Sequence, residues 1–101
     1  MARFVVIYKG GSIPDSPEAQ QESLNTWMKW FESLGSAVSQ VGSPFGESVA
    51  VDAHGVTSSS SGLTGFSVVE AETIAAAAEL ISNCPIYADG GTTELYQSLM
   101  M

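Results

Sequence analysis

The chain has 101 residues, the length of one small domain, and its eleven acidic and three basic residues give a formal net charge of −8. Nucleic acids and anionic membrane surfaces are bound through lysine and arginine, so a chain with only Arg3, Lys9 and Lys29 is expected to bind neither. With 45% hydrophobic and 14% charged residues, the chain is too apolar for disorder, and its scarcity of charged surface favours self-association.

The cysteine and histidine content argues against metal and cofactor sites. Cys84 is the single cysteine, which excludes an internal disulfide and a cysteine-rich zinc site, and His54 is the single histidine. No glycine-rich phosphate loop followed by lysine is present, so we expect no cofactor. No apolar run approaches the roughly 20 residues that span a bilayer, and the N-terminus lacks a signal-peptide pattern, so we expect a cytoplasmic protein.

The first third of the chain predicts a strand and a long helix. Residues 3–8 are apolar at nearly every position, which is typical of a central strand covered on both faces. Ser16 and Pro17 begin a helix that Gly35 ends. Apolar residues at three- and four-residue spacing form its expected buried face, with Trp30 off this face: Leu24, Trp27, Met28, Phe31 and Leu34.

The middle of the chain predicts strands joined by turns. We expect a strand over 37–41, a turn or bulge over 42–46, and a continuation of the strand over 47–51. Residues 52–55 have the composition of a tight turn, and the serine-rich run 58–62 that of a mobile loop. A further strand is expected over 64–70, around Phe66.

The last third predicts a short helix and a closing strand. The helix is expected over 73–82, with Ile74, Ala77, Ala78 and Ile81 on its packed face, and the Asn83-Cys84-Pro85 segment ends it. The last strand is expected from Thr92 to about Met100. The order βαββαβ predicts an α+β, ferredoxin-like domain over residues 1–101, with an antiparallel sheet and two helices on one face.

Four segments resemble the YCII-related, DGPF-type protein family. They are Gly-Ser-Pro-Phe-Gly-Glu-Ser at 42–48, Thr-Gly-Phe-Ser-Val-Val-Glu-Ala at 64–71, Asn-Cys-Pro at 83–85 and Gly-Gly-Thr-Thr-Glu-Leu-Tyr at 90–96. The resemblance implies a homodimer in which two ferredoxin-like sheets pack face to face as a dimeric α+β barrel. It also implies a function among small-molecule-binding or enzyme-like domains, since a few relatives are dehydrochlorinase-like enzymes acting on small aromatic rings and others accompany sigma factors.

Two positions depart from the family pattern. Enzyme-like members resemble one another in a histidine near the first helix paired with an aspartate, whereas residues 22–27 of this chain contain no histidine. The Asp-Gly-Pro-Phe tetrad is replaced by Gly-Ser-Pro-Phe at 42–45. The resemblance therefore does not carry a catalytic residue over to this chain.

Four residues are candidates for acid–base chemistry. His54 is the single side chain with an ordinary pKa near neutrality, and Asp52 would share its side of a strand. The alternative is that both belong to a solvated hairpin turn. Glu47, like Glu94, would act as an acid or base in an apolar cleft, and would otherwise face water on an edge strand.

Four aromatic residues are candidates for an apolar ligand pocket: Tyr8, Trp27, Trp30 and Phe45. The alternative for Trp27 and Trp30 is packing of the helix on the sheet. Tyr87 and Tyr96 suit interfaces as well as pockets, and Cys84 is expected to be buried and unreactive. Two functions stay open: binding of, or catalysis on, a small neutral or aromatic molecule, and a non-catalytic dimerising interaction module.

Overall fold

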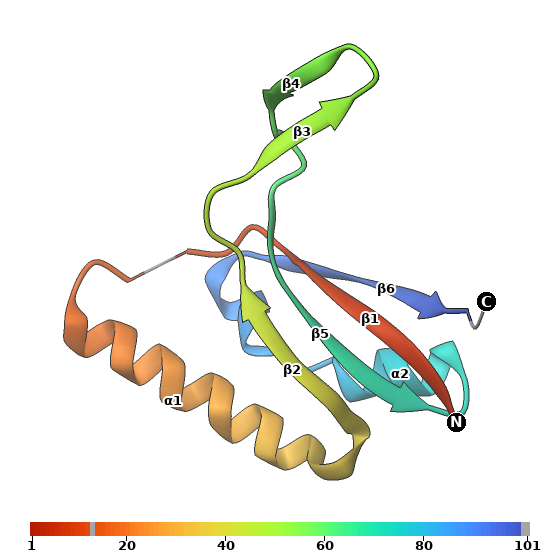
Figure 1. Ribbon diagram of the computed structural model, residues 1–101. Helices are drawn as coiled ribbons and strands as arrows, with labels where there is room; N and C mark the ends of the chain where they lie inside the picture. The colour runs from red at the N-terminus through yellow and green to blue at the C-terminus, as the bar shows by residue number, and fades with distance from the viewer. Residues whose placement is uncertain (13, 100–101) are drawn as a thin grey trace.

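The computed structural model describes residues 1–12 and 14–99. It contains a four-stranded antiparallel sheet in the order β2–β5–β1–β6, formed by β1 (Ala2–Lys9), β2 (Val38–Pro44), β5 (Leu63–Ala71) and β6 (Thr92–Ser98). Helices α1 (Pro17–Leu34) and α2 (Ile74–Leu80) cover one face of this sheet (Figure 1). Two short 3-10 turns, η1 (Gly35–Ala37) and η2 (Pro85–Asp89), follow the helices. The predicted ferredoxin-like α+β fold is confirmed.

A capping side chain begins each helix; Ser16 is the predicted cap of α1, while α2 is shorter than the range 73–82 that the sequence predicts. The Ser16 side chain accepts a hydrogen bond from the Ala19 amide at the start of α1, and Gly35 follows the helix with a φ of 58°. The Thr73 side chain accepts from the Ala76 amide at the start of α2. The last strand ends at Ser98, and the predicted extension to Met100 lies outside the described residues.

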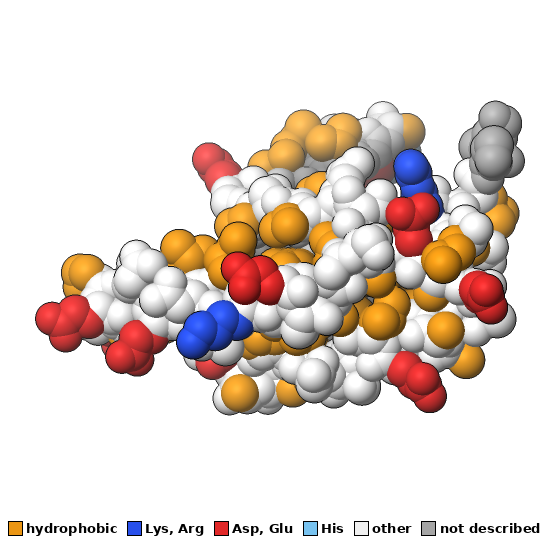
Figure 2. All heavy atoms as spheres, turned by 90° about the horizontal axis from the view of Figure 1, so that it is seen from below, with side chains coloured by type: hydrophobic (Ala, Val, Ile, Leu, Met, Phe, Trp, Pro, Cys, Tyr) orange, Lys and Arg blue, Asp and Glu red, His pale blue; other side chains and the backbone are white. Residues whose placement is uncertain are grey.

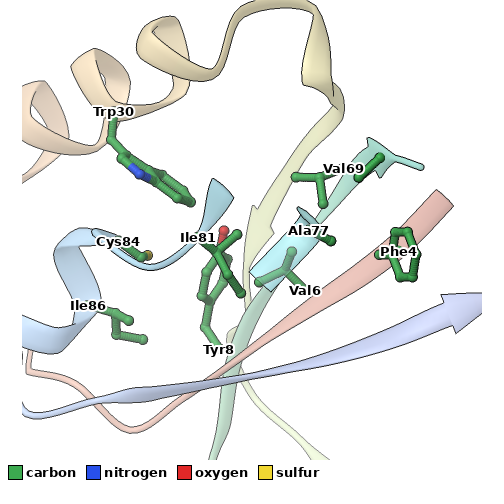
Figure 3. Packing of buried hydrophobic residues seen from close by; sticks show 10 residues of the cluster. Phe4, Val6, Tyr8, Trp30, Val69, Ala77, Ile81, Cys84 and Ile86 are labelled. Carbon is green, nitrogen blue, oxygen red and sulfur yellow. The ribbon is translucent and has the colours of Figure 1, made fainter. Parts of the chain in front are cut away.

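The core lies between the helices and one face of the sheet (Figure 3). β1 contributes Phe4, Val6 and Tyr8 to it, and β5 contributes Val69 and Ala71. The helical side of the core comprises Trp30, Ala77, Ile81, Cys84 and Ile86. On the predicted packed face of α2, Ala77 and the following Ile81 are buried, whereas Ile74 and Ala78 are exposed.

The buried face of α1 differs from the prediction. Trp30 is its most buried side chain, 6% exposed, whereas Leu24 and Met28 are exposed. Three- and four-residue spacing fits the observed set 27, 30, 31 and 34 equally well. Trp30 also gains a partner for its indole N–H, which donates to Asn83 Oδ1 at 2.9 Å. Pattern alone therefore could not choose between the two neighbouring faces.

The middle of the chain forms a separate hairpin, in which the sequence predicts the turn but not the second strand. β3 (Val49–Asp52) pairs with β4 (Gly55–Ser58) instead of continuing β2, and the hairpin projects beyond one end of the sheet (Figure 1). The turn over 52–55 is confirmed, but part of the expected loop is strand β4. The sequence does not indicate this strand, because only Val56 and Thr57 favour one, between Gly55 and the serine run that begins at Ser58.

Strand β1 is covered on one face only within this chain. Phe4, Val6 and Tyr8 are buried, while Val5 and Ile7 point to the other face and stay partly exposed. The expectation of a strand covered on both faces is therefore wrong for the isolated chain. The apolar residues of the second face form an open surface of the sheet.

Candidate functional site

The open face of the sheet, opposite the helices, is apolar at its centre. Val5 of β1 lies between Val68 of β5 and Tyr96 of β6, and Ile7 lies opposite Phe66. Directly opposed residues in antiparallel strands point to the same face, so these side chains form one continuous surface. No helix of the described chain covers them, because both helices occupy the other face.

The charges on this open face cancel. The charged residues of the four strands are Arg3, Lys9, Glu70 and Glu94, two basic and two acidic. Arg3 Nε lies 3.9 Å from Glu70 Oε1, and Lys9 Nζ lies 3.2 Å from Glu94 Oε2. Since the whole chain carries −8, the excess negative charge lies elsewhere on the molecule. Acidic side chains outnumber basic ones on the side of the molecule shown in Figure 2.

Three polar side chains form a cluster at one end of the open face. Glu94 accepts hydrogen bonds from Lys9 Nζ at 3.2 Å and from the Tyr96 hydroxyl at 2.6 Å. The hydrogen bond from Tyr96, together with Lys9, lowers the pKa of Glu94, and the same bond raises the pKa of Tyr96. At neutral pH the cluster therefore presents an ammonium, a carboxylate and a protonated phenol.

A depression of about 630 Å³ lies between this polar cluster and the apolar centre. This volume is within the range of small-molecule sites, which are mostly apolar with a few polar anchors. The depression is open toward solvent, so one side of it has no wall in the isolated chain. Its lining comprises Val5, Ile7, Lys9, Ser61, Leu63, Glu94 and Tyr96.

A second, smaller depression of about 360 Å³ adjoins the first at the base of the hairpin. The two depressions share Ser61 and Leu63, so the open face continues into the hairpin without a break. Phe45 lines the second depression and stacks on Phe66, with the ring centroids 6.0 Å apart.

Three of the four predicted pocket aromatics lie on the opposite face of the sheet. Tyr8 and Trp30 are buried in the core, and Trp27 packs edge-on against Tyr8 with a centroid distance of 5.1 Å. The Tyr8 hydroxyl donates to Ser67 Oγ at 2.8 Å, and Ser67 donates to the Val41 carbonyl at 2.6 Å. The structure does not bring these three residues together with Phe45, and it favours the packing alternative for both tryptophans.

Three of the predicted acid–base residues, Asp52, His54 and Glu47, are exposed, and only Asp52 and His54 lie on the hairpin. Asp52 Oδ1 accepts a hydrogen bond from the His54 backbone amide at 2.7 Å, so the pair forms a turn and not an imidazole–carboxylate contact. Glu47 lines the second depression, away from the hairpin turn. Asp52 and His54 line neither of the two depressions.

Lys9 is the residue of the polar cluster that the sequence does not single out. Glu94 and Tyr96 are named there as candidates, but the Lys9–Glu94 contact joins residues 85 positions apart and requires the register of β1 and β6. The sequence did carry a signal for the open face: β1 is apolar on both of its faces, which indicates that the face opposite the helices also needs a cover.

Cys84 is buried, and desolvation raises its pKa to about 11, as expected for an unreactive thiol. Within residues 1–12 and 14–99, no group of three His, Cys, Asp or Glu side chains is arranged to hold a metal ion. In the same residues no helix has both the length and the apolar composition needed to cross a membrane.

Comparison with known proteins gives one informative likeness, and it concerns the fold. No family model and no curated protein sequence matches the chain. A solved structure of 5-chloro-2-hydroxyhydroquinone dehydrochlorinase (TftG) from Burkholderia phenoliruptrix, in complex with 2,5-dihydroxybenzoquinone, is similar with a TM-score of 0.58. The two share 20% identity, over 97% of this chain and 95% of the other. The likeness supports a YCII-like fold, while membership of the family stays a prediction.

Proposed function

We propose that the chain is a YCII-like domain that binds a small neutral or aromatic molecule on the open face of its sheet, within a homodimer. The observation that carries the proposal is the open depression, which combines an apolar floor with the polar cluster of Lys9, Glu94 and Tyr96. A flat ring would lie on Val5 and Ile7, while its polar substituents would meet the cluster.

The pKa directions favour binding over proton transfer. Glu94 is held ionised and Tyr96 protonated near neutral pH, so neither is poised to exchange a proton with a substrate. The cluster instead offers Lys9 as a donor and Glu94 as an acceptor for hydroxyl or carbonyl groups. Hydroxylated rings are the first ligand class to test, because the structurally similar dehydrochlorinase holds 2,5-dihydroxybenzoquinone.

The area and shape of the molecule support the dimer. Its extents are 43 × 41 × 19 Å, and its accessible surface is 7064 Å². A compact monomer of 10.6 kDa exposes about 5,500 Å². The accessible surface of this chain is larger than that of such a monomer by more than the roughly 800 Å² that each partner buries in a standard interface. The open face suits this interface, because its charges cancel while the rest of the acidic chain would repel a second copy.

Calorimetric titration with hydroquinone and 2,5-dihydroxybenzoquinone tests the binding site. Ile7→Glu puts a charge on the floor of the depression and should weaken binding at least about tenfold, since an unpaired charge is costly next to an apolar ligand. Leu24→Glu is the matched control, because Leu24 is exposed on α1. Equal affinities of wild type and Ile7→Glu would contradict the site.

The second candidate function is a non-catalytic interaction module that uses the same open face. The open shape of the depression favours this second function, because the surface of a partner protein could fill an open depression as readily as a ligand could. This candidate would be favoured if the wild-type protein forms a stable dimer but binds none of a set of phenols, quinones and amines.

A further inference from the structure

The hairpin of β3 and β4 has one apolar side that nothing in the described chain covers. Val51 lies directly opposite Val56 and shares its side of the hairpin with Val49. Their side chains are 59% (Val49), 71% (Val51) and 65% (Val56) exposed. Ala50 and Thr57 form the opposite side of the same two strands.

A hairpin of this kind does not persist well by itself. Isolated two-stranded hairpins are marginally stable in water and need packing against a further element. β3 and β4 contact each other, and no helix or strand of the described residues packs closely against them. Figure 1 shows the hairpin extending past the end of the sheet, away from both helices. Its valine side therefore needs a cover from outside the chain.

Three observations favour a second copy of this chain as the cover. The two adjoining depressions join the base of the hairpin to the open face, which is the proposed dimer interface. The hairpin itself carries a single carboxylate, Asp52, so it avoids the like-charge repulsion that the rest of the acidic surface would produce. The surplus of accessible surface leaves room for an interface larger than one sheet face.

We infer that the β3–β4 hairpin is an arm that packs its valine side, Val49, Val51 and Val56, onto a second copy of the chain. The inference rests on the proposed homodimer and extends it from the sheet to the hairpin. Each copy contributes one arm, so the interface comprises the open faces of the sheets and two symmetric arm contacts.

Sedimentation equilibrium of the full chain and two hairpin variants tests the arm. Val51→Asp places a charge on the valine side and should raise the dimer dissociation constant at least about tenfold, because the carboxylate would be buried without a partner. Thr57→Asp places the same charge on the opposite side of the same hairpin and should change the constant less than about twofold. Circular dichroism checks that both variants stay folded.

A sheet variant separates failure of the arm from failure of the dimer. Val5→Asp changes the centre of the open face and should also produce monomers. If Val5→Asp dissociates the dimer while Val51→Asp and Thr57→Asp behave alike, the arm is refuted and the sheet dimer stands. If the wild type sediments as a monomer of 10.6 kDa at micromolar concentration, both the dimer and the arm are refuted.

Discussion

Glu94 joins the two other side chains of the polar cluster on the open face. Its carboxylate accepts from both Lys9 and Tyr96, so one charged acceptor holds two donors in place beside an apolar floor. Such charge-assisted hydrogen bonds are stronger than neutral ones. The contribution of the ionised carboxylate to stability is present above its ordinary pKa of 4.5 and is lost as the pH falls through its lowered pKa.

Glu94→Gln should lower the pKa of Tyr96 toward its ordinary value of 10.0, because the carboxylate that favours the protonated phenol is gone. A pH titration of the Tyr96 ring resonances by NMR measures this directly. Glu79→Gln, an exposed change on α2, is the control and should leave the Tyr96 titration unchanged. An identical Tyr96 pKa in wild type and Glu94→Gln would contradict the cluster.

Tyr8 is buried, and its hydroxyl donates a hydrogen bond to Ser67. Burial raises its pKa to about 12, although its hydrogen bond to Ser67 opposes this shift. The folded chain therefore holds the Tyr8 proton more tightly than the unfolded chain does. Its contribution to stability is complete below pH 10.0 and is lost as the pH rises toward about 12.

Tyr8→Phe should cost about 1 kcal/mol of unfolding free energy near neutral pH, the value of one buried hydrogen bond. Urea denaturation at about pH 8 and about pH 11 should show this difference shrinking by about 1 kcal/mol at the higher pH, because the variant has no phenol to deprotonate. A difference that stays constant across this range would show that Tyr8 ionises as readily in the folded chain as in the unfolded chain.

At the scale of elements, strand β2 depends on a glycine. Gly42 has a φ of 76°, lies where the β2–β5 register is irregular, and has no room for a side chain, because a Cβ would overlap the Phe66 carbonyl. The Ser67–Val41 hydrogen bond lies beside this irregularity. The backbone of β2 can approach β5 here only with glycine at 42.

Gly42→Ala should destabilise the chain by about 2 kcal/mol or more, because it adds a positive-φ penalty to a steric clash with backbone. Gly46→Ala is the matched control: it lies four residues away in open space and should change stability by less than about 1 kcal/mol. Thermal unfolding of the two variants measures the contrast. Equal melting temperatures would contradict the close approach of β2 to β5.

The sequence predicts the elements that have strong local signals. Helix α1 follows from its cap and apolar spacing, β1 from its nearly continuous apolar run, and β5 from the apolar residues around Phe66. Strand β4 was not expected because it runs into the serine-rich segment that predicts a loop, and its pairing depends on the turn at 52–55. Trp30 is buried while Leu24 and Met28 are exposed, and this depends on how α1 lies across the sheet. The spacing of apolar residues does not determine that orientation.

At the scale of the whole molecule, the candidate site is largely a product of topology. Aromatic content pointed to Trp27 and Trp30, but the sheet places them on the helical side, opposite the open depression. Lys9 and Glu94 meet because β1 and β6 are neighbours in the sheet order, although they lie at opposite ends of the chain. Residue type suggested candidates, and strand order decided which of them share a surface.

The thin shape of the molecule connects the site with the dimer. One sheet and one layer of helices give a body 19 Å thick whose second sheet face is apolar and uncharged in sum. A second copy on this face would supply the wall that the depression lacks. Ligand binding and dimerisation are therefore expected to strengthen each other.

The most direct test of the proposed function is an amide and indole NMR map of the chain titrated with 2,5-dihydroxybenzoquinone. We predict saturable shifts at the amides of Ile7, Lys9 and Tyr96, with the Trp30 indole N–H unmoved, because it is bonded to Asn83 on the other side of the sheet. Shifts at the Trp27 and Trp30 indoles with an unchanged open face would contradict the account and place the site on the helical side.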